Sequence, residues 1–233
     1  MGNLDRLKLF IKAHRTDILV GVGIFVLALL PRAIDLGVFL TADEKNWMGR
    51  SFEFIRAFKD VRLNDMLQTT HPGVTALWMI GVAITAKMFL AGVPFSFQTL
   101  PVFVTAAQFS VALANALVVP VVYFFLRKLF SGRTLPVVAS LLIALNPFII
   151  GYSRVAHVDA LLMSFLFLAV LATIIYGKTG FSRRWLVVSA VFSALAMLTK
   201  APAVFMIPFF WLVMLAQALF LQTIFSQKDT VIV

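Results

Sequence analysis

Long runs of apolar residues recur along almost the whole chain, and they restrict its fold more than any other feature. The first run extends from about residue 18 to residue 38, long enough to cross the ~30 Å hydrocarbon core of a bilayer as a helix. Further spans are expected at about 102–126, 135–150, 158–176, 185–198 and 203–221. Only 13% of the residues are charged, against roughly a quarter in soluble domains. The sequence therefore predicts an all-α polytopic membrane protein.

The apolar run at 74–95 is treated differently, because the basic residues argue against its crossing the membrane. If this run lies in the interface, the basic loops at 127–133 and 178–184 fall on the same side as the N-terminus. Cytoplasmic loops carry the excess of Lys and Arg in membrane proteins, which explains the net charge of +10 without a nucleic acid partner. We therefore expect six transmembrane helices in the plasma (cell) membrane, a cytoplasmic N-terminus, and an outer loop over 39–100 with two interfacial helices.

The outer loop contains the polar stretch in which chemistry is expected. Asp43 and Glu44 are adjacent there, and His71-Pro72-Gly73 follows. The predicted topology brings polar residues of later loops to the same side of the membrane: Arg154, His157, Asp159 and Lys200. Ionisable residues near or within spans are costly to insert and usually mark function. The sequence thus indicates one polar site at the outer face.

Taken singly, these residues also have structural explanations. Asp43 and Glu44 could cap the helix that follows them, where the helix dipole favours acids. Arg154 and Asp159 could form an interfacial ion pair. Lys200 could extend from the end of a span toward the headgroups. Residue type and position alone leave these alternatives open.

One pair of charges is expected to be structural. Arg32 and Asp35 lie three residues apart near the outer end of the first span. Side chains at i and i+3 share one face of a helix, so the sequence predicts an ion pair between them.

Considered together, the polar motifs resemble a known family. In chain order they are Leu40-Thr-Ala-Asp43-Glu44, His71-Pro72-Gly73, Ser153-Arg154 with Asp159, and Leu198-Thr199-Lys200-Ala201-Pro202. Their order and shared membrane side resemble the N-terminal half of the polyprenyl-phosphate-dependent glycosyltransferases of the GT-C fold, in particular the protein O-mannosyltransferase-like and aminoarabinose lipid A transferase-like groups. Relatives often have proline in place of Gly73 and glycine in place of Ala201. They also continue through further spans, so this chain is expected to be truncated relative to the family.

The resemblance implies transfer of a sugar from a polyprenyl-phosphate-linked donor to an acceptor hydroxyl at the extracytoplasmic face, with inversion at the anomeric carbon. The acceptor would be a protein, a lipid or a glycan. A carboxylate within hydrogen-bond reach can act as the general base for the hydroxyl, and Asp43 is the predicted base, with Glu44 as the second catalytic carboxylate. Arg154 and Lys200 are predicted to bind the donor phosphate, whose negative charge grows as the bond breaks.

Three further residues are predicted to support the site: His71, His157 and Asp159. No cofactor is firmly predicted, although Glu44 and His71 could hold a divalent cation. The alternative is a non-catalytic membrane protein, either a transporter segment or a subunit that binds lipid phosphate. A transporter predicts polar side chains at the depth of the bilayer midplane, whereas catalysis predicts Asp43, Arg154 and Lys200 around one outward-facing cavity.

Overall fold

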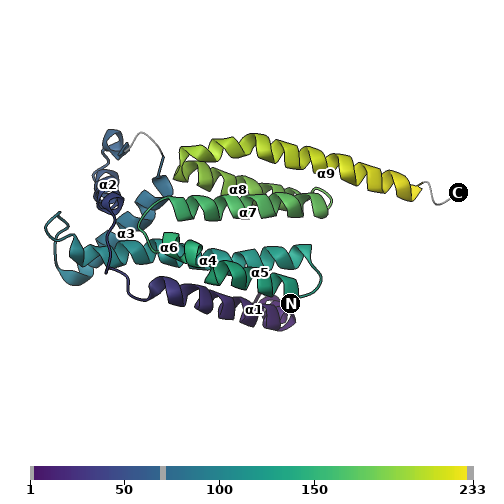
Figure 1. Cartoon of the computed structure of the whole chain (residues 1–233), viewed down its shortest axis with the longest axis horizontal. Helices are drawn as coiled ribbons and strands as arrows, with labels where there is room; N and C mark the ends of the chain where they lie inside the picture. The colour runs from purple at the N-terminus through teal and green to yellow at the C-terminus, as the bar shows by residue number, and fades with distance from the viewer. Residues whose placement is uncertain (1–2, 69–71, 230–233) are drawn as a thin grey trace.

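A computed structural model describes residues 3–68 and 72–229, and within these ranges all regular structure is helical (Figure 1). The helices that run side by side along the long axis are α1 (Asn3–Ala33), α4 (Pro101–Leu129), α5 (Thr134–Leu145), α7 (Asp159–Lys178), α8 (Arg183–Thr199) and α9 (Met206–Asp229). At one end of this bundle lie α2 (Ala42–Lys59) and α3 (Val74–Ala91). The predicted all-α polytopic fold is confirmed.

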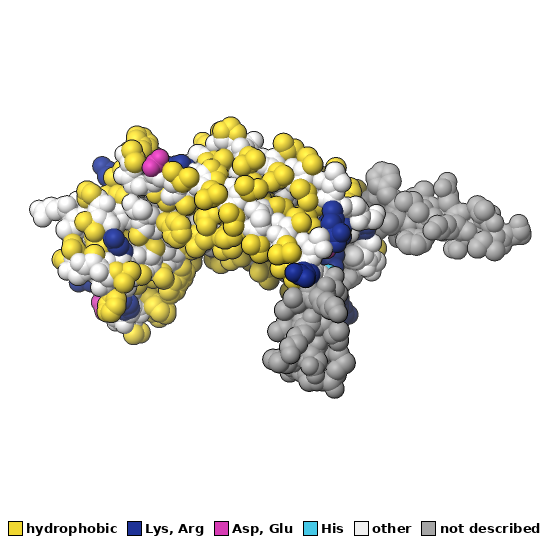
Figure 2. Space-filling view, turned by 90° about the horizontal axis from the view of Figure 1, so that it is seen from below, with side chains coloured by type: hydrophobic (Ala, Val, Ile, Leu, Met, Phe, Trp, Pro, Cys, Tyr) yellow, Lys and Arg dark blue, Asp and Glu magenta, His cyan; other side chains and the backbone are white. Residues whose placement is uncertain are grey.

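Five of the described helical segments are long and apolar enough to cross a membrane. They are His14–Ala33, Val74–Ala91, Pro101–Leu129, Asp159–Lys178 and Ala201–Leu219, the last of which joins a short 3-10 helix (Ala201–Phe205) to α9. Apolar side chains cover much of the bundle between its ends, as expected of a surface that faces lipid (Figure 2). Because α3 also meets the length criterion, its predicted position in the interface stays a prediction.

The helix α2 is an amphipathic helix that begins at a capping box. Thr41 accepts the backbone N–H of Glu44 through its side chain, and the Glu44 carboxyl accepts the backbone N–H of Thr41. The buried face of α2 packs on α3, where Gly81 permits close approach: a Cβ atom there would lie 2.5 Å from the backbone oxygen of Ser51. A 3-10 turn (Leu63–Met66) follows α2. The described helices of the segment 39–100 therefore form a layer on the end of the bundle.

A sixth candidate span is broken. The helix α5 is followed by the short helix α6 (Pro147–Ser153) at a bend of 57°. Proline has no N–H, so Pro147 cannot donate to the carbonyl of Ile143, and the side chain of Asn146 takes the N–H of Phe148 at 3.0 Å. The bend therefore leaves the last carbonyl groups of α5 without their helical donors.

Arg32 supplies the missing donors. Its guanidinium is fully buried and donates to the backbone carbonyl groups of Ala144 at 2.7 Å and Ile143 at 3.4 Å, as well as to Ala28 within its own helix. A cation also suits the negative end of the α5 dipole. The predicted ion pair with Asp35 is wrong, because Asp35 lies beyond the end of α1 in a left-handed conformation with φ of 52°.

We expect Arg32→Met to destabilise the protein by about 2 kcal/mol. The buried carbonyl groups lose their charged donors, which destabilises the fold, and removal of the cost of burying the guanidinium offsets part of that loss. In a chain of this length the corresponding fall in melting temperature is about 4–8 °C. Thermal unfolding of the purified protein in detergent measures it. Arg15→Met, the same change at an exposed position of α1, is the control. Equal melting temperatures for the two variants would contradict this role for Arg32.

Candidate functional site

The predicted site residues converge at the end of the bundle that carries α2 and α3 (Figure 1). Asp43 and Glu44 stand in the first turn of α2, and Arg154 follows α6. Asp159 opens α7, and Lys200 follows the last residue of α8. His71 lies outside the described residues. The tertiary structure thus brings together groups more than 100 positions apart in the sequence.

Asp43 is exposed and lines a cavity of about 450 Å³. His157 and Asp159 line the same cavity. Its wall on the α6 side carries two aromatic rings, Phe148 and Tyr152, which are largely exposed and whose centroids are 4.7 Å apart. The cavity therefore combines an accessible carboxylate with an apolar wall, which suits a ligand with both a polar group and a hydrocarbon surface.

Glu44, next to Asp43 in sequence, is fully buried. One carboxyl oxygen accepts the N–H of Thr41 at 2.7 Å, and the other accepts the side-chain amide of Gln108 at 2.9 Å and the backbone N–H of Ala156 at 2.8 Å. These bonds connect α2 to α4 and to the loop between α6 and α7. The geometry favours the capping interpretation of Glu44 over a catalytic one.

The carboxylate of Asp159 contacts two other side chains, those of Lys200 and His157. One of its carboxyl oxygens pairs with the Lys200 ammonium at 2.6 Å, and the other lies 3.2 Å from Nδ1 of His157. The three side chains are 22–37% exposed, so solvent weakens the ion pair as a source of stability. Its main effect is to place the ammonium of Lys200 beside the cavity that Asp43 lines.

Trp47 is buried among the converging segments. Its ring meets the His157 ring edge to face, with centroids 5.7 Å apart. Gly73 lies against the six-membered ring of Trp47, where a Cβ atom at position 73 would be 2.5 Å from the ring. The φ angle of +77° at Gly73 also favours glycine. The Gly73 N–H donates to the Thr199 carbonyl at 2.9 Å, and the Thr75 and Thr199 hydroxyl groups are 2.7 Å apart. Proline could not replace glycine here.

Arg154 lies apart from this cavity. Its guanidinium donates to the carbonyl groups of Pro31 and Asp35, each at 3.0 Å, and so caps the end of α1. It lines an adjacent cavity of about 330 Å³ that shares Gly151 and Val155 with the cavity of Asp43. Asp159 pairs with Lys200, not with Arg154. Asp43 and Arg154 therefore line two adjacent cavities instead of the expected single one, and Lys200 is connected to the first of them through Asp159.

A metal site is not built from the residues that the structure describes. Among them, no three His, Asp or Glu side chains are grouped so that they could hold an ion. Glu44 already accepts three N–H groups, and the other predicted ligand, His71, lies outside the described ranges. The divalent cation stays an untested prediction.

Sequence reasoning missed Gln108. This amide is buried, accepts the Gly37 N–H at 2.8 Å, and donates to the Phe39 carbonyl and to Glu44, each at 2.9 Å. An amide within the apolar run of 102–126 was the available signal. At mid-depth of the bundle, Asn115 accepts the Ser164 hydroxyl at 2.6 Å. These polar groups satisfy one another, which makes them structural.

A bundle of long apolar helices defines the class of polytopic membrane proteins, and here a cavity with polar side chains lies at one end of the bundle. The family model for dolichyl-phosphate-mannose-protein mannosyltransferase matches residues 102–228, more than half of the chain. The protein belongs to this family of polyprenyl-phosphate-sugar glycosyltransferases, with a GT-C-like fold. The matched segment contains Arg154, Asp159 and Lys200, whereas Asp43 precedes it. Searches of curated proteins and of solved structures found no match.

Proposed function

We propose that this protein transfers a sugar, with inversion, from a polyprenyl-phosphate-linked donor to a hydroxyl group of a protein, lipid or glycan acceptor. The transfer takes place at the extracytoplasmic face of the plasma membrane, and the N-terminus is cytoplasmic. The observation that carries this proposal is the exposed carboxylate of Asp43 in a cavity beside the Asp159–Lys200 pair, within a chain of this family.

Asp43 is the proposed general base. The acceptor hydroxyl loses its proton as its oxygen attacks the anomeric carbon, and the carboxylate of Asp43 takes that proton. Glu44 contributes indirectly, because its buried hydrogen bonds hold the first turn of α2 and with it the backbone of Asp43. We therefore assign Glu44 a positioning role.

The leaving group is a polyprenyl phosphate, which gains negative charge as the glycosidic bond breaks. The ammonium of Lys200, held by Asp159, is the proposed partner of that charge. His157 supports Asp159 on its other oxygen. Arg154 uses two of its five N–H donors on the carbonyl groups of Pro31 and Asp35, which leaves further donors for phosphate in the adjacent cavity.

The aromatic wall suits the donor's apolar part. Phe148 is 67% exposed and Tyr152 48% exposed, and both line the cavity of Asp43. Tyrosine, with an apolar ring and a polar hydroxyl, is favoured at membrane interfaces, where the first isoprene units and the sugar of the donor would meet, and Phe148 adds apolar surface beside Tyr152.

A transfer assay tests this function. Membranes that contain the protein are incubated with polyprenyl-phosphate sugars, with the corresponding nucleotide sugars as a control, and the configuration of the product is determined. Inverted product from the lipid-linked donor alone is expected. No transfer from a panel of lipid-linked hexoses and pentoses would overturn the proposal and favour a non-catalytic protein that binds lipid phosphate.

Within the same assay, Lys200→Gln is expected to lower kcat/KM for the lipid-linked donor by about 10²-fold, since an electrostatic partner of the transition state is removed. Lys87→Gln, a lysine on α3 outside the site, should have no such effect. Thermal unfolding should change little for either variant, because the Lys200 ion pair is partly exposed. Equal activity of the two variants would contradict the assignment of Lys200.

A further inference from the structure

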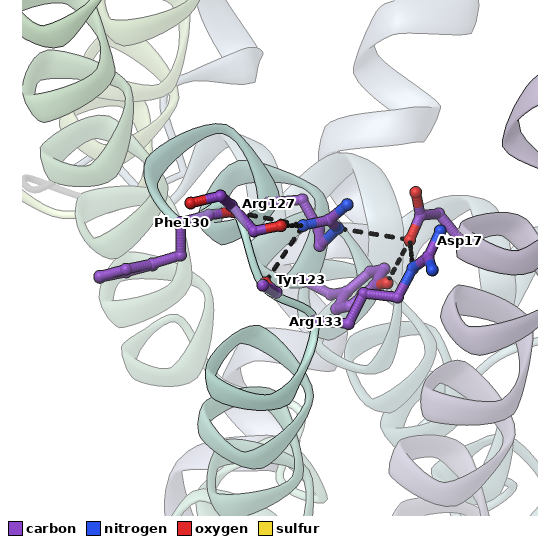
Figure 3. Close-up of polar contacts among 7 residues, drawn as sticks. Asp17, Tyr123, Arg127, Phe130 and Arg133 are labelled. Atoms are coloured by element: carbon purple, nitrogen blue, oxygen red, sulfur yellow. Dashed lines mark hydrogen bonds and ion pairs between the residues drawn. The ribbon is translucent and has the colours of Figure 1, made fainter.

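The opposite end of the bundle carries a cluster of charges that the proposed reaction does not use. Asp17 of α1 accepts three donors from the α4 end and the loop after it, through a single carboxyl oxygen (Figure 3). The Tyr123 hydroxyl lies at 2.8 Å, Arg127 Nε at 3.3 Å and Arg133 Nε at 2.8 Å. The hydrogen bond to Asp17 raises the pKa of Arg133.

Arg127 is held rigidly in this cluster. Besides the bond from Nε to Asp17, its Nη1 donates to the carbonyl groups of Phe130, Ser131 and Gly132 at 3.0–3.2 Å (Figure 3). These carbonyls follow the C-terminus of α4, so Arg127 also fixes the loop after that helix. The third nitrogen, Nη2, makes no hydrogen bond to any residue that the structure describes. A fixed guanidinium with one unused donor group is preorganised for an anion.

A cavity of about 400 Å³ lies at this cluster, between α1 and α4. Its lining consists of His14, Asp17, Ile18, Phe124, Arg127 and Lys128. Arg127, Lys128 and Arg133 carry three positive charges against the one negative charge of Asp17, which leaves a surplus of two. In Figure 2 basic side chains gather at this end of the molecule, at the border of the apolar surface.

The apolar part of the lining distinguishes a lipid from a soluble anion. Phe124 is 39% exposed, and it packs on Gly21 of α1, where a Cβ atom would be 3.0 Å from the ring. Leu19, one position beyond Ile18, is 61% exposed. The cavity therefore passes from a basic rim to surfaces that face the hydrocarbon of the bilayer, the layout of a phospholipid from its headgroup to its first acyl carbons.

We propose that this cavity binds the phosphate of an anionic phospholipid in the leaflet opposite the candidate active site. Arg127 Nη2 and the exposed ammonium of Lys128 donate to the phosphate oxygens, and Ile18 and Phe124 contact the start of the acyl chains. Asp17 does not repel the lipid, because Arg127 and Arg133 both neutralise it. The bound lipid would connect α1 to α4 at this end.

Binding of fluorescent phosphatidylglycerol to the purified protein in a neutral detergent tests the proposal, with the matching phosphatidylcholine as the second probe. We expect phosphatidylglycerol to bind at least fivefold more tightly, and Lys128→Gln to weaken its binding about fivefold, the contribution of one basic residue near an anionic headgroup. Arg184→Gln is the matched control. Arg184 is exposed at the start of α8. It lies at the same end of the bundle as Lys128, because Lys178 in the last turn of the preceding helix α7 donates to the Leu129 carbonyl of α4.

Three results would overturn the proposal. Equal affinity for the two lipids would show that the headgroup charge is not recognised. Equal weakening by Lys128→Gln and Arg184→Gln would show attraction by diffuse surface charge instead of a site. Displacement of the lipid by millimolar inorganic phosphate would identify a site for soluble phosphate. Arg127→Gln, with its melting temperature measured in parallel, is expected to weaken binding more than Lys128→Gln does, because Arg127 is the fixed donor.

Discussion

Asp43→Asn is expected to lower the rate of sugar transfer by a factor of about 10²–10⁴, the usual contribution of a general base. The amide keeps the size of the carboxylate but cannot take the proton of the acceptor hydroxyl. Since the Asp43 side chain is exposed, the folded structure should not depend on its charge. The measurement is the initial rate of transfer from a polyprenyl-phosphate sugar, together with the melting temperature of the purified variant.

The control for this variant is Asp60→Asn, the same substitution at the end of α2. Asp60 is half exposed and pairs only weakly with Arg62, at 3.3 Å. It should keep wild-type activity. If Asp43→Asn transferred sugar at the wild-type rate, the general-base assignment would fail, while the function itself would still be judged by the transfer assay on the unmodified protein.

Glu44→Gln is expected to destabilise the protein by about 3 kcal/mol, although it alters the residue next to Asp43. The substitution places an NH₂ group where the carboxyl accepts hydrogen bonds, and at least one buried donor among Thr41, Gln108 and Ala156 loses its acceptor. The melting temperature should fall by about 6–12 °C. Activity should fall with it, because the same bonds position Asp43.

Glu53→Gln is the matched control, since it makes the same change on the same helix. Glu53 is 47% exposed and lies 3.7 Å from Arg56, so its loss should change the stability by less than about 0.5 kcal/mol. A Glu44→Gln variant with wild-type stability and strongly reduced activity would instead give Glu44 a direct catalytic role.

Much of the fold could be predicted because its signals are local. A run of apolar residues of bilayer length specifies a spanning helix without reference to its partners, and the basic loops at 127–133 and 178–184 belong to one end of the bundle in both the prediction and the structure. The first of the two helices expected within 39–100 corresponds to α2, which begins at Ala42 because Thr41 caps it. Contacts between helices were harder to predict, because they depend on residues far apart in the sequence. Arg32, for example, donates to a backbone carbonyl of α5 and does not pair with Asp35.

The sequence by itself determined that this chain forms a membrane helix bundle and that Asp43, Glu44, Arg154, Asp159 and Lys200 gather at one end. It predicted Asp43 as the base, but it left Glu44 open between a catalytic and a capping role, because both carboxylates lie at the start of the same helix and have similar chemistry. Consecutive side chains on a helix point about 100° apart, so the two carboxylates meet different surroundings, and these surroundings are supplied by other elements of the fold. Only the tertiary structure distinguishes them. The side-chain amide of Gln108 in α4 and the backbone N–H of Ala156 donate to the buried carboxylate of Glu44, whereas Asp43 lines the cavity.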